Sequence, residues 1–136
     1  TDGAAQATIR EIHRRWPHDP SRPTPAQTAV ATLRPVFTPE VGPAFLESIA
    51  TGPEHLRMLR RVAPRSGISV PMVARGAVLG ALSFIRYAGG EPYTEADVGF
   101  AQELTRRAAV ALDHARLHQS ALQANAAKAH FLATMS

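Results

Sequence analysis

The sequence contains no cysteine, and this absence excludes several chemistries at once. Without a thiol the chain cannot form a disulfide, a thiolate metal site or a thiol nucleophile, nor can it attach a tetrapyrrole through cysteine. A membrane-spanning helix needs about 20 apolar residues, and no stretch of that length is free of charged side chains. We therefore expect no membrane insertion and a cytoplasmic location.

Lysine and aromatic residues are also scarce. Lys128 is the only lysine among 15 basic residues, and aromatics make up 6% of the chain. The arginines include isolated pairs, such as Arg60–Arg61 and Arg106–Arg107, with no aromatic residues alternating between them. A nucleic-acid surface needs a continuous basic stripe. The formal net charge of +4 therefore predicts solvated helix faces and no nucleic-acid partner.

The N-terminal half of the chain is rich in proline and predicts short elements. Apolar residues recur on one face over residues 5–16, which predicts a helix that ends at Pro17. Four prolines over residues 17–25 predict a loop. After this loop we expect a short helix over 26–33, an extended piece over 35–39, and two short helices over 43–50 and 53–62.

The strongest local pattern predicts a β-hairpin. Two runs of β-favouring residues, 68–73 and 78–85, flank a tight turn in which Gly76 supplies a positive φ. Both faces of the second run are apolar, so we expect it to be a central strand covered on both sides. Gly80 suggests the close approach of another element, and Pro71 predicts an unpaired or bulged position.

A long helix is predicted from residue 94 to the end of the sequence. Thr94 is a good N-cap, and Asp97 three residues later resembles a capping box. Neither glycine nor proline occurs from Ala101 onwards, so the helix runs for about 40 residues, or roughly 60 Å. A domain of this size does not need so long a helix. Helices of this length usually leave the domain and pair with a partner.

The helix carries a stripe of small and apolar residues at heptad spacing, which favours a coiled coil. Before residue 113 the stripe includes Ala101, Leu104, Ala108 and Ala111, and there we expect it mainly to cover the sheet. Beyond residue 113 we expect it to form a homodimer. The residues predicted to lie in this dimer contact are Ala115, His118, Leu122, Asn125, Ala129 and Leu132.

Two motifs resemble the C-terminal part of a GAF domain. Val70-Pro71-Met72 and Gly76-Ala-Val-Leu-Gly80-Ala-Leu82 are similar to the family pattern V-P-L followed by G-x-x-x-G-x-L. Residues 111–117 are similar to the exit-helix pattern A-x-x-N-A-x-L, with His114 where Asn is common. The resemblance implies an α+β fold with a GAF-like antiparallel sheet, flanking helices and a long C-terminal exit helix. The family's N-terminal helix and first two strands, which would precede the helix expected over 5–16, have no counterpart in this sequence.

The tail carries a second resemblance. Residues 127–136 are similar to the A-K-x-x-F-L-A-x-M-S run that precedes the phosphoacceptor histidine in the dimerisation domain of histidine kinases. His130 precedes the Phe-Leu pair and is not that histidine. Together the two resemblances imply a GAF-like sensor domain over 1–117 and a signalling helix over 118–136. We expect no enzymatic activity, because neither the phosphoacceptor nor an ATP-binding motif is present.

The resemblance also implies a cavity between the sheet and the helices of residues 26–63. The candidate wall residues are Phe37, Phe45, Leu46, Ile49, Leu59, Met72 and Phe84. These side chains could bind a small ligand, or they could fill the core outright. Cyclic nucleotides are not expected, because the acidic and Asn/Lys motif of the GAF domains that bind them is not apparent.

Other candidate sites are weak. His114 and His118 are spaced i, i+4 on one helix, which can ligate a metal, but no third ligand accompanies them. No base or acid can be assigned to Ser66, Ser69 or Ser83. We therefore expect no metal, no cofactor and no catalytic residue.

The sequence thus predicts a cytoplasmic sensory domain of a bacterial two-component sensor histidine kinase. It would relay a signal through its exit helix to a kinase core. One alternative is a structural dimerisation module that binds no ligand. Another is a GAF regulator of a different output, such as a phosphatase or a transcription factor, and the tail motif argues against it.

Overall fold

The structure is a computed structural model, which describes residues 11, 14–15, 21 and 23–135. Most of the helix predicted over 5–16 lies outside these residues, although Glu11, Arg14 and Arg15 are helical. The described elements follow in the order α2 (Pro25–Thr32), β1 (Val36–Thr38), α3 (Pro43–Ile49), α4 (Pro53–Val62), β2 (Pro64–Ala74), β3 (Ala77–Tyr87) and α5 (Glu95–Met135). The predicted order of short helices, hairpin and long exit helix is confirmed.

Each of the three short helices begins with a proline in its first turn, where the missing N–H has no intrahelical partner to lose. In α2 a capping box adds to this start. The Gln27 backbone N–H donates to Thr24 Oγ1, and the Thr24 backbone N–H donates to Gln27 Oε1. The prolines therefore determine where these three helices begin, and they also prevent the helices from extending further toward the N-terminus.

The three strands form one antiparallel sheet in the order β1-β2-β3. The two residues at the tip of the predicted hairpin, Arg75 and Gly76, have φ angles of +50° and +75°. Positive φ at both central residues matches the right-handed twist of the flanking strands. The hairpin is confirmed, and its turn places a non-glycine residue in the left-handed region.

Among the strands that the structure describes, the second hairpin strand does not lie centrally, contrary to the expectation from sequence. β2 is the central strand, since it pairs with both β1 and β3, whereas β3 pairs with β2 alone among the described strands. Val78 and Ile85 of β3 are also exposed, so the faces of this strand are less fully covered than expected. Pro71 does not prevent β2 from being central, because β1 pairs only with Gly67 to Ser69. Side chains point toward the two faces of a sheet, whereas neighbouring strands pair along its edges. An apolar pattern on both faces therefore does not predict how many strands pair with a given strand.

Gly80 is required by its backbone conformation and not by a close neighbouring element, which corrects the expectation from sequence. Its φ is +147°, and the nearest atom to an added Cβ would be the Met72 side chain at an ordinary 3.6 Å. The register between β2 and β3 shifts between Met72 and Val73, so Leu79 has no opposite residue and the bulge lies on β3. Pro71 itself pairs with Ala81 of β3 and, among the described residues, has no partner on the β1 side, as expected from sequence.

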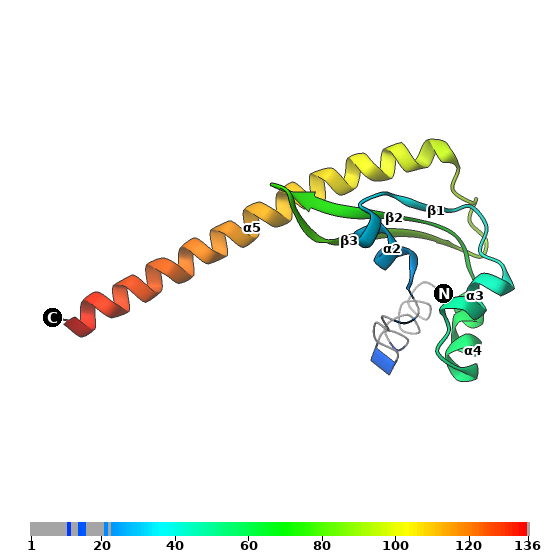
Figure 1. Ribbon diagram of the computed structural model, residues 1–136, viewed down its shortest axis with the longest axis horizontal. Coiled ribbons are helices and arrows are strands. Elements are labelled where there is room, and N and C mark those ends of the chain that lie inside the picture. Colours follow the sequence, from blue (N-terminus) through cyan, green and yellow to red (C-terminus); the bar gives the residue numbers. More distant parts are fainter. Residues whose placement is uncertain (1–10, 12–13, 16–20, 22, 136) are drawn as a thin grey trace.

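Helices cover both faces of the sheet (Figure 1). α5 packs on one face, where Ile68 and Val70 of β2 form a buried cluster with Ala101. α2 contacts the opposite face of β2 and β3. The alternation of side chains along a strand thus divides β2 between a face that packs on α5 and a face that looks toward the short helices.

α5 runs across the sheet and then continues far beyond the rest of the protein (Figure 1). Asp97 caps its start by accepting hydrogen bonds from the Thr94 backbone N–H and hydroxyl. The helix buries Ala101, Thr105, Ala109 and Asp113, and every residue from His114 to Thr134 is exposed. Ala101 of the heptad stripe faces the sheet, as expected for the part of the stripe before residue 113. Phe100 stands on the outer side with 67% of its surface exposed.

Within the part of the chain that the structure describes, no helix is long and apolar enough to cross a membrane.

Candidate functional site

A cavity lies between the sheet and the short helices, on the face opposite α5. Its volume is about 510 Å³, within the range of 300–1,000 Å³ that is typical of small-molecule sites. Described residues from α2, α3, α4 and all three strands line it. They are Thr24, Pro25, Ala26, Thr38, Val41, Phe45, Ile49, His55, Leu59, Val62, Pro64, Ser66, Gly67, Ser69, Ala81, Ser83, Ile85 and Tyr87.

The floor of the cavity follows from strand alternation. On β3 the residues at every second position, Ala81, Ser83, Ile85 and Tyr87, face the cavity. Ser69 of β2 lies directly opposite Ser83, and their hydroxyl oxygens are 2.8 Å apart. The floor is therefore mainly apolar, and the Ser69–Ser83 pair and the Tyr87 phenol supply polar groups to it.

One face of α4 forms the wall. His55, Leu59 and Val62 follow one another at spacings of four and three residues, which places them on the same side of the helix. Leu59 and Val62 supply apolar surface, whereas His55 is a polar group that is 7% exposed. This part of the wall, like the floor, is therefore mainly apolar, and His55 is its polar group.

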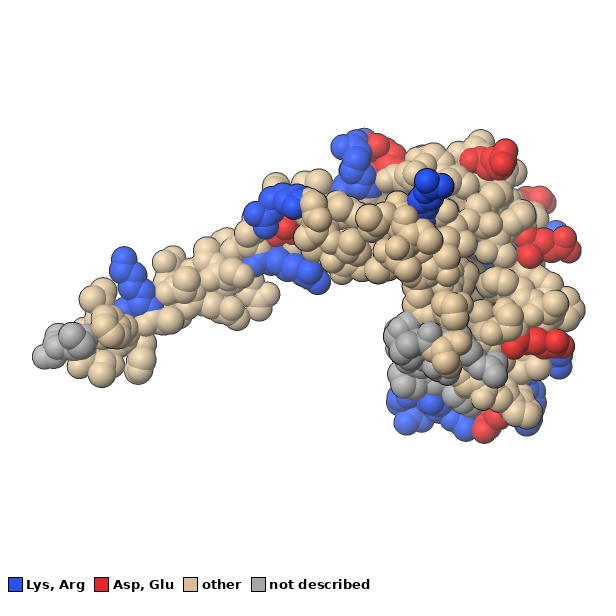
Figure 2. All heavy atoms as spheres, viewed as in Figure 1, with Lys and Arg blue, Asp and Glu red and all other residues tan. Residues whose placement is uncertain are grey.

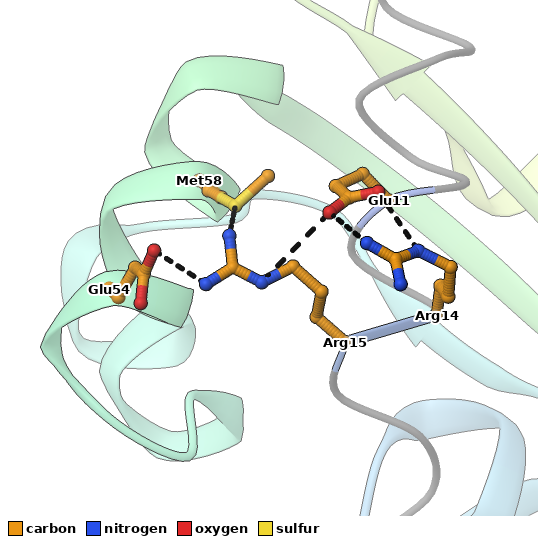
Figure 3. A network of polar contacts seen from close by, with 5 residues as sticks. All are labelled: Glu11, Arg14, Arg15, Glu54 and Met58. Atoms are coloured by element: carbon orange, nitrogen blue, oxygen red, sulfur yellow. Dashed lines mark hydrogen bonds and ion pairs between the residues drawn. The ribbon is translucent and has the colours of Figure 1, made fainter.

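A polar network holds α4 from its outer side (Figure 3). Arg15 donates to Glu54 Oε1 at 2.6 Å and contacts the Met58 sulfur at 3.8 Å. The same guanidinium approaches Glu11 at 4.0 Å, and a hydrogen bond from Arg14 lowers the pKa of the Glu11 carboxyl. Because these contacts join Arg15 to α4, they support the cavity wall without entering the cavity.

His55 is oriented by the residue that precedes its helix. Its Nδ1 accepts a hydrogen bond from the Thr51 backbone N–H at 3.1 Å, and the Thr51 hydroxyl lies 3.2 Å from the same atom. An accepting Nδ1 places the proton of the neutral ring on Nε2. Burial lowers the pKa of His55 from its usual 6.5, so the ring is neutral at pH 7. Burial likewise raises the pKa of the Tyr87 phenol and favours its protonated form.

The GAF domain pattern matches residues 3–112. The chain belongs to the GAF domain family. The fold expected from the motifs, a GAF-like antiparallel sheet with flanking helices and a long C-terminal helix, is confirmed. No curated protein matches the chain by sequence.

Solved structures share the GAF fold. A GAF domain/HD domain protein from Geobacter sulfurreducens superposes with a TM-score of 0.59 at 22% identity, covering 82% of this chain and 68% of that one. The cyanobacteriochrome TePixJ GAF domain gives 0.50 at 21% identity, covering 79% and 62%. A weaker likeness, 0.48 at 13% identity over 88% and 96%, involves a domain assigned to a two-component sensor histidine kinase protein from Sinorhizobium meliloti 1021.

Three of the seven residues that we expected in the cavity wall of this GAF domain line it: Phe45, Ile49 and Leu59. Phe37 and Phe84 instead pack against the buried cluster beneath α5, on the opposite face of the sheet. Leu46 is buried outside the cavity lining, and Met72 lies beside Gly80 in the hairpin. The Ser69–Ser83 pair and His55 were not among the expected wall residues. Their convergence depends on strand register and helix packing, which the motifs do not specify.

An ion pair connects the hairpin tip with α5. Arg75 Nε and Nη2 donate to the two carboxylate oxygens of Asp113 at 2.9 and 3.1 Å. The Asp113 side chain is 12% exposed, whereas that of Arg75 is 64% exposed. Asp113 is also the last buried residue of α5 in the described chain. The pair therefore fixes the helix to the strands of the cavity floor at the point where the helix leaves the domain.

Neither a metal nor a nucleic-acid site emerges from the described residues. They contain no group of three or more metal-ligating side chains, and His114 and His118 are exposed on α5. Figure 2 shows the basic side chains scattered over the visible face and interspersed with acidic ones. Several arginines are paired locally with Glu103 or Glu47. The visible face therefore carries no continuous basic surface of the kind that binds nucleic acid.

Proposed function

We propose that this chain is a cytoplasmic sensory domain of a bacterial two-component sensor histidine kinase. A small molecule in the cavity would change how α5 is held, and α5 would carry that change to a kinase core. The observation that carries the proposal is the placement of a cavity and a projecting helix on opposite faces of one sheet. Membership of the GAF domain family and the kinase-like motif at residues 127–136 support it.

The cavity favours a sensor over a structural module with a filled core. A volume of about 510 Å³ is large compared with the water-sized voids of ordinary protein interiors. The polar groups in its wall also have defined orientations, which is typical of sites that recognise a ligand. A module that only dimerised would require neither feature.

The projecting part of α5 supports the formation of a homodimer. The residues expected in the dimer contact are all exposed, namely Ala115, His118, Leu122, Asn125, Ala129 and Leu132. Leu104 of the same stripe is also exposed, as is Phe100 one helical turn before it. Apolar side chains at heptad spacing gain stability by packing against a second helix. We propose that two copies pair in parallel along α5 as a coiled coil.

The proposal assigns no catalytic step to residues 1–136. Incubation of the chain with ATP and Mg²⁺ is expected to leave it unphosphorylated. Phosphate incorporation above that of a heat-denatured control would contradict this.

A thermal-shift screen of the chain against small metabolites tests the sensing function. A ligand at 100 times its Kd stabilises the folded state by about 2.7 kcal/mol, which raises the melting temperature by several degrees. Ala81→Trp, which fills the cavity floor, should abolish the shift, whereas Val78→Trp on the same strand but outside the cavity should retain it. Compounds that stabilise all three proteins equally would contradict a role for the cavity.

A further inference from the structure

We infer that the cavity takes an uncharged, largely apolar small molecule that presents one hydroxyl or amide edge to the Ser69–Ser83 pair. This inference rests on the proposed sensing function and names the chemical class of the ligand.

The first observation is the absence of charge in the lining. None of the described residues that line the cavity is Lys, Arg, Asp or Glu. Burial of a phosphate, carboxylate or ammonium group is strongly unfavourable unless an opposite charge compensates the lost hydration. An ionised ligand would therefore have to enter without a partner in this lining. A neutral ligand carries no such penalty.

The second observation is that nearby cations are engaged elsewhere. Arg65 of β2 donates to the Gly90 carbonyl oxygen at 2.7 Å, away from the cavity floor. Arg86 of β3 lies over the Tyr93 ring, 5.0 Å from its centroid, on the face of the sheet that packs on α5. Both arginines belong to strands of the cavity floor, and neither lines the cavity.

The titratable groups of the lining, His55 and Tyr87, are also favoured in their uncharged forms. His55 accepts a hydrogen bond at Nδ1, so its neutral ring carries a donor at Nε2 and no positive charge. Burial shifts the pKa of His55 down and that of Tyr87 up, each toward the neutral form. The same desolvation acts on any ligand that enters, so it too is favoured in its neutral form.

The serine pair defines the polar edge of the ligand. A hydroxyl has one donor and two acceptor sites, so when one serine donates to the other, the pair retains one hydrogen and several lone pairs. Ser69 is buried, whereas Ser83 is exposed toward the cavity. A ligand edge that both accepts and donates, such as an alcohol or amide, matches this pair. The apolar residues around it accommodate the remainder of the molecule.

Matched probes test directly whether the cavity prefers a neutral ligand to an ionised one, a preference called the charge rule below. Each pair consists of an aromatic carboxamide and the carboxylate of the same skeleton, with benzene, naphthalene and biphenyl as the three skeletons. Binding is followed at pH 7.5 through the backbone amide NMR signals of Ser69, Ala81 and Ser83. We expect at least one carboxamide to shift these signals saturably. Its carboxylate should bind at least about tenfold more weakly because it loses hydration without gaining a partner.

A variant that introduces a positive charge into the cavity tests the same point, and a matched variant outside the cavity serves as its control. Ser83→Lys places a cation at the cavity floor and should raise carboxylate affinity by about tenfold, because opposite charges attract more strongly away from bulk water. Val78→Lys makes the same change on the same strand at an exposed position outside the cavity, and should leave both affinities unchanged.

The outcomes separate the two proposals. If a carboxylate shifts the cavity signals as strongly as its carboxamide, the charge rule is overturned and the sensing function stands. If no probe shifts these signals, and the metabolite screen also finds no ligand that Ala81→Trp blocks, both proposals are overturned.

Discussion

At the scale of single residues, burial holds the His55 ring in its uncharged form. The pKa of His55 is lowered from 6.5 in the folded protein, so the unfolded chain binds more protons below that pH. Its contribution to the free energy of unfolding is therefore complete above about pH 6.5 and decreases as the pH falls through and below that value. Other groups add their own pH dependence, and a variant is needed to separate them.

His55→Asn is that variant, because its amide oxygen can accept the Thr51 hydrogen bond but cannot be protonated in this range. We expect urea unfolding to show a smaller loss of stability between pH 7.5 and pH 5.5 in His55→Asn than in the unaltered chain. Equal losses in the two proteins would show that His55 is not desolvated in the folded state.

Ile68 is the largest fully buried side chain among the described residues, with 1% of its surface exposed. Its truncation to alanine should lower the free energy of unfolding by about 2–5 kcal/mol, and Ile68→Val by about 0.5–1.5 kcal/mol. Val73→Ala, at an exposed position of the same strand, should change it by less than about 0.5 kcal/mol. Urea unfolding measures all three. Equal effects at residues 68 and 73 would contradict a core between β2 and α5.

Sequence predicts residues less well where their role depends on strand register. Ser69 and Ser83 had no assigned partners in the sequence, because their pairing requires the alignment of two strands around a bulge. Phe37 and Phe84 are apolar like true wall residues, but side-chain alternation places them beneath α5. Phe45, Ile49 and Leu59 were predictable as apolar faces of short helices.

At the scale of elements, the Arg75–Asp113 pair joins the hairpin to α5. Arg75→Asn keeps a residue that tolerates positive φ but removes the guanidinium from a mostly buried carboxylate. We expect a loss of about 1–3 kcal/mol in the free energy of unfolding. Faster amide hydrogen exchange should accompany it in α5 around Asp113.

Arg106→Asn is the control on the same helix, since its ion pair with Glu103 is exposed and local. It should leave both stability and exchange near Asp113 unchanged. If Arg75→Asn behaves like this control, the hairpin tip does not hold the helix.

The elements themselves were largely predictable. Prolines, caps and apolar periodicity gave three short helices, the hairpin and the long helix close to their observed bounds. The position of β3 at the edge of the described sheet was not predictable from its own residues. Pairing depends on which strands are available, and a strand with two apolar faces carries no information about that choice.

At the scale of the whole molecule, the account depends on what α5 does beyond the sheet. Leu122 and Leu132 are 54% and 57% exposed in the single chain. Burial of a leucine in a helix pair contributes about 1.5–3 kcal/mol, or a factor of ten or more in Kd per residue. The double change of Leu122 and Leu132 to Glu should therefore convert a dimer to monomer in light scattering. Gln119→Glu with Gln123→Glu, off the stripe, should not.

The most direct test of signal transfer uses the absence of native cysteine, which allows a single spin label at Gln123→Cys on the projecting helix. Parallel helices 8–10 Å apart place the two labels of a dimer close together, at one narrow distance in double electron–electron resonance. The account predicts that filling the cavity by Ala81→Trp shifts this distance distribution, and that Val78→Trp does not. Identical distributions in all three proteins would contradict the claim that the cavity controls the helix.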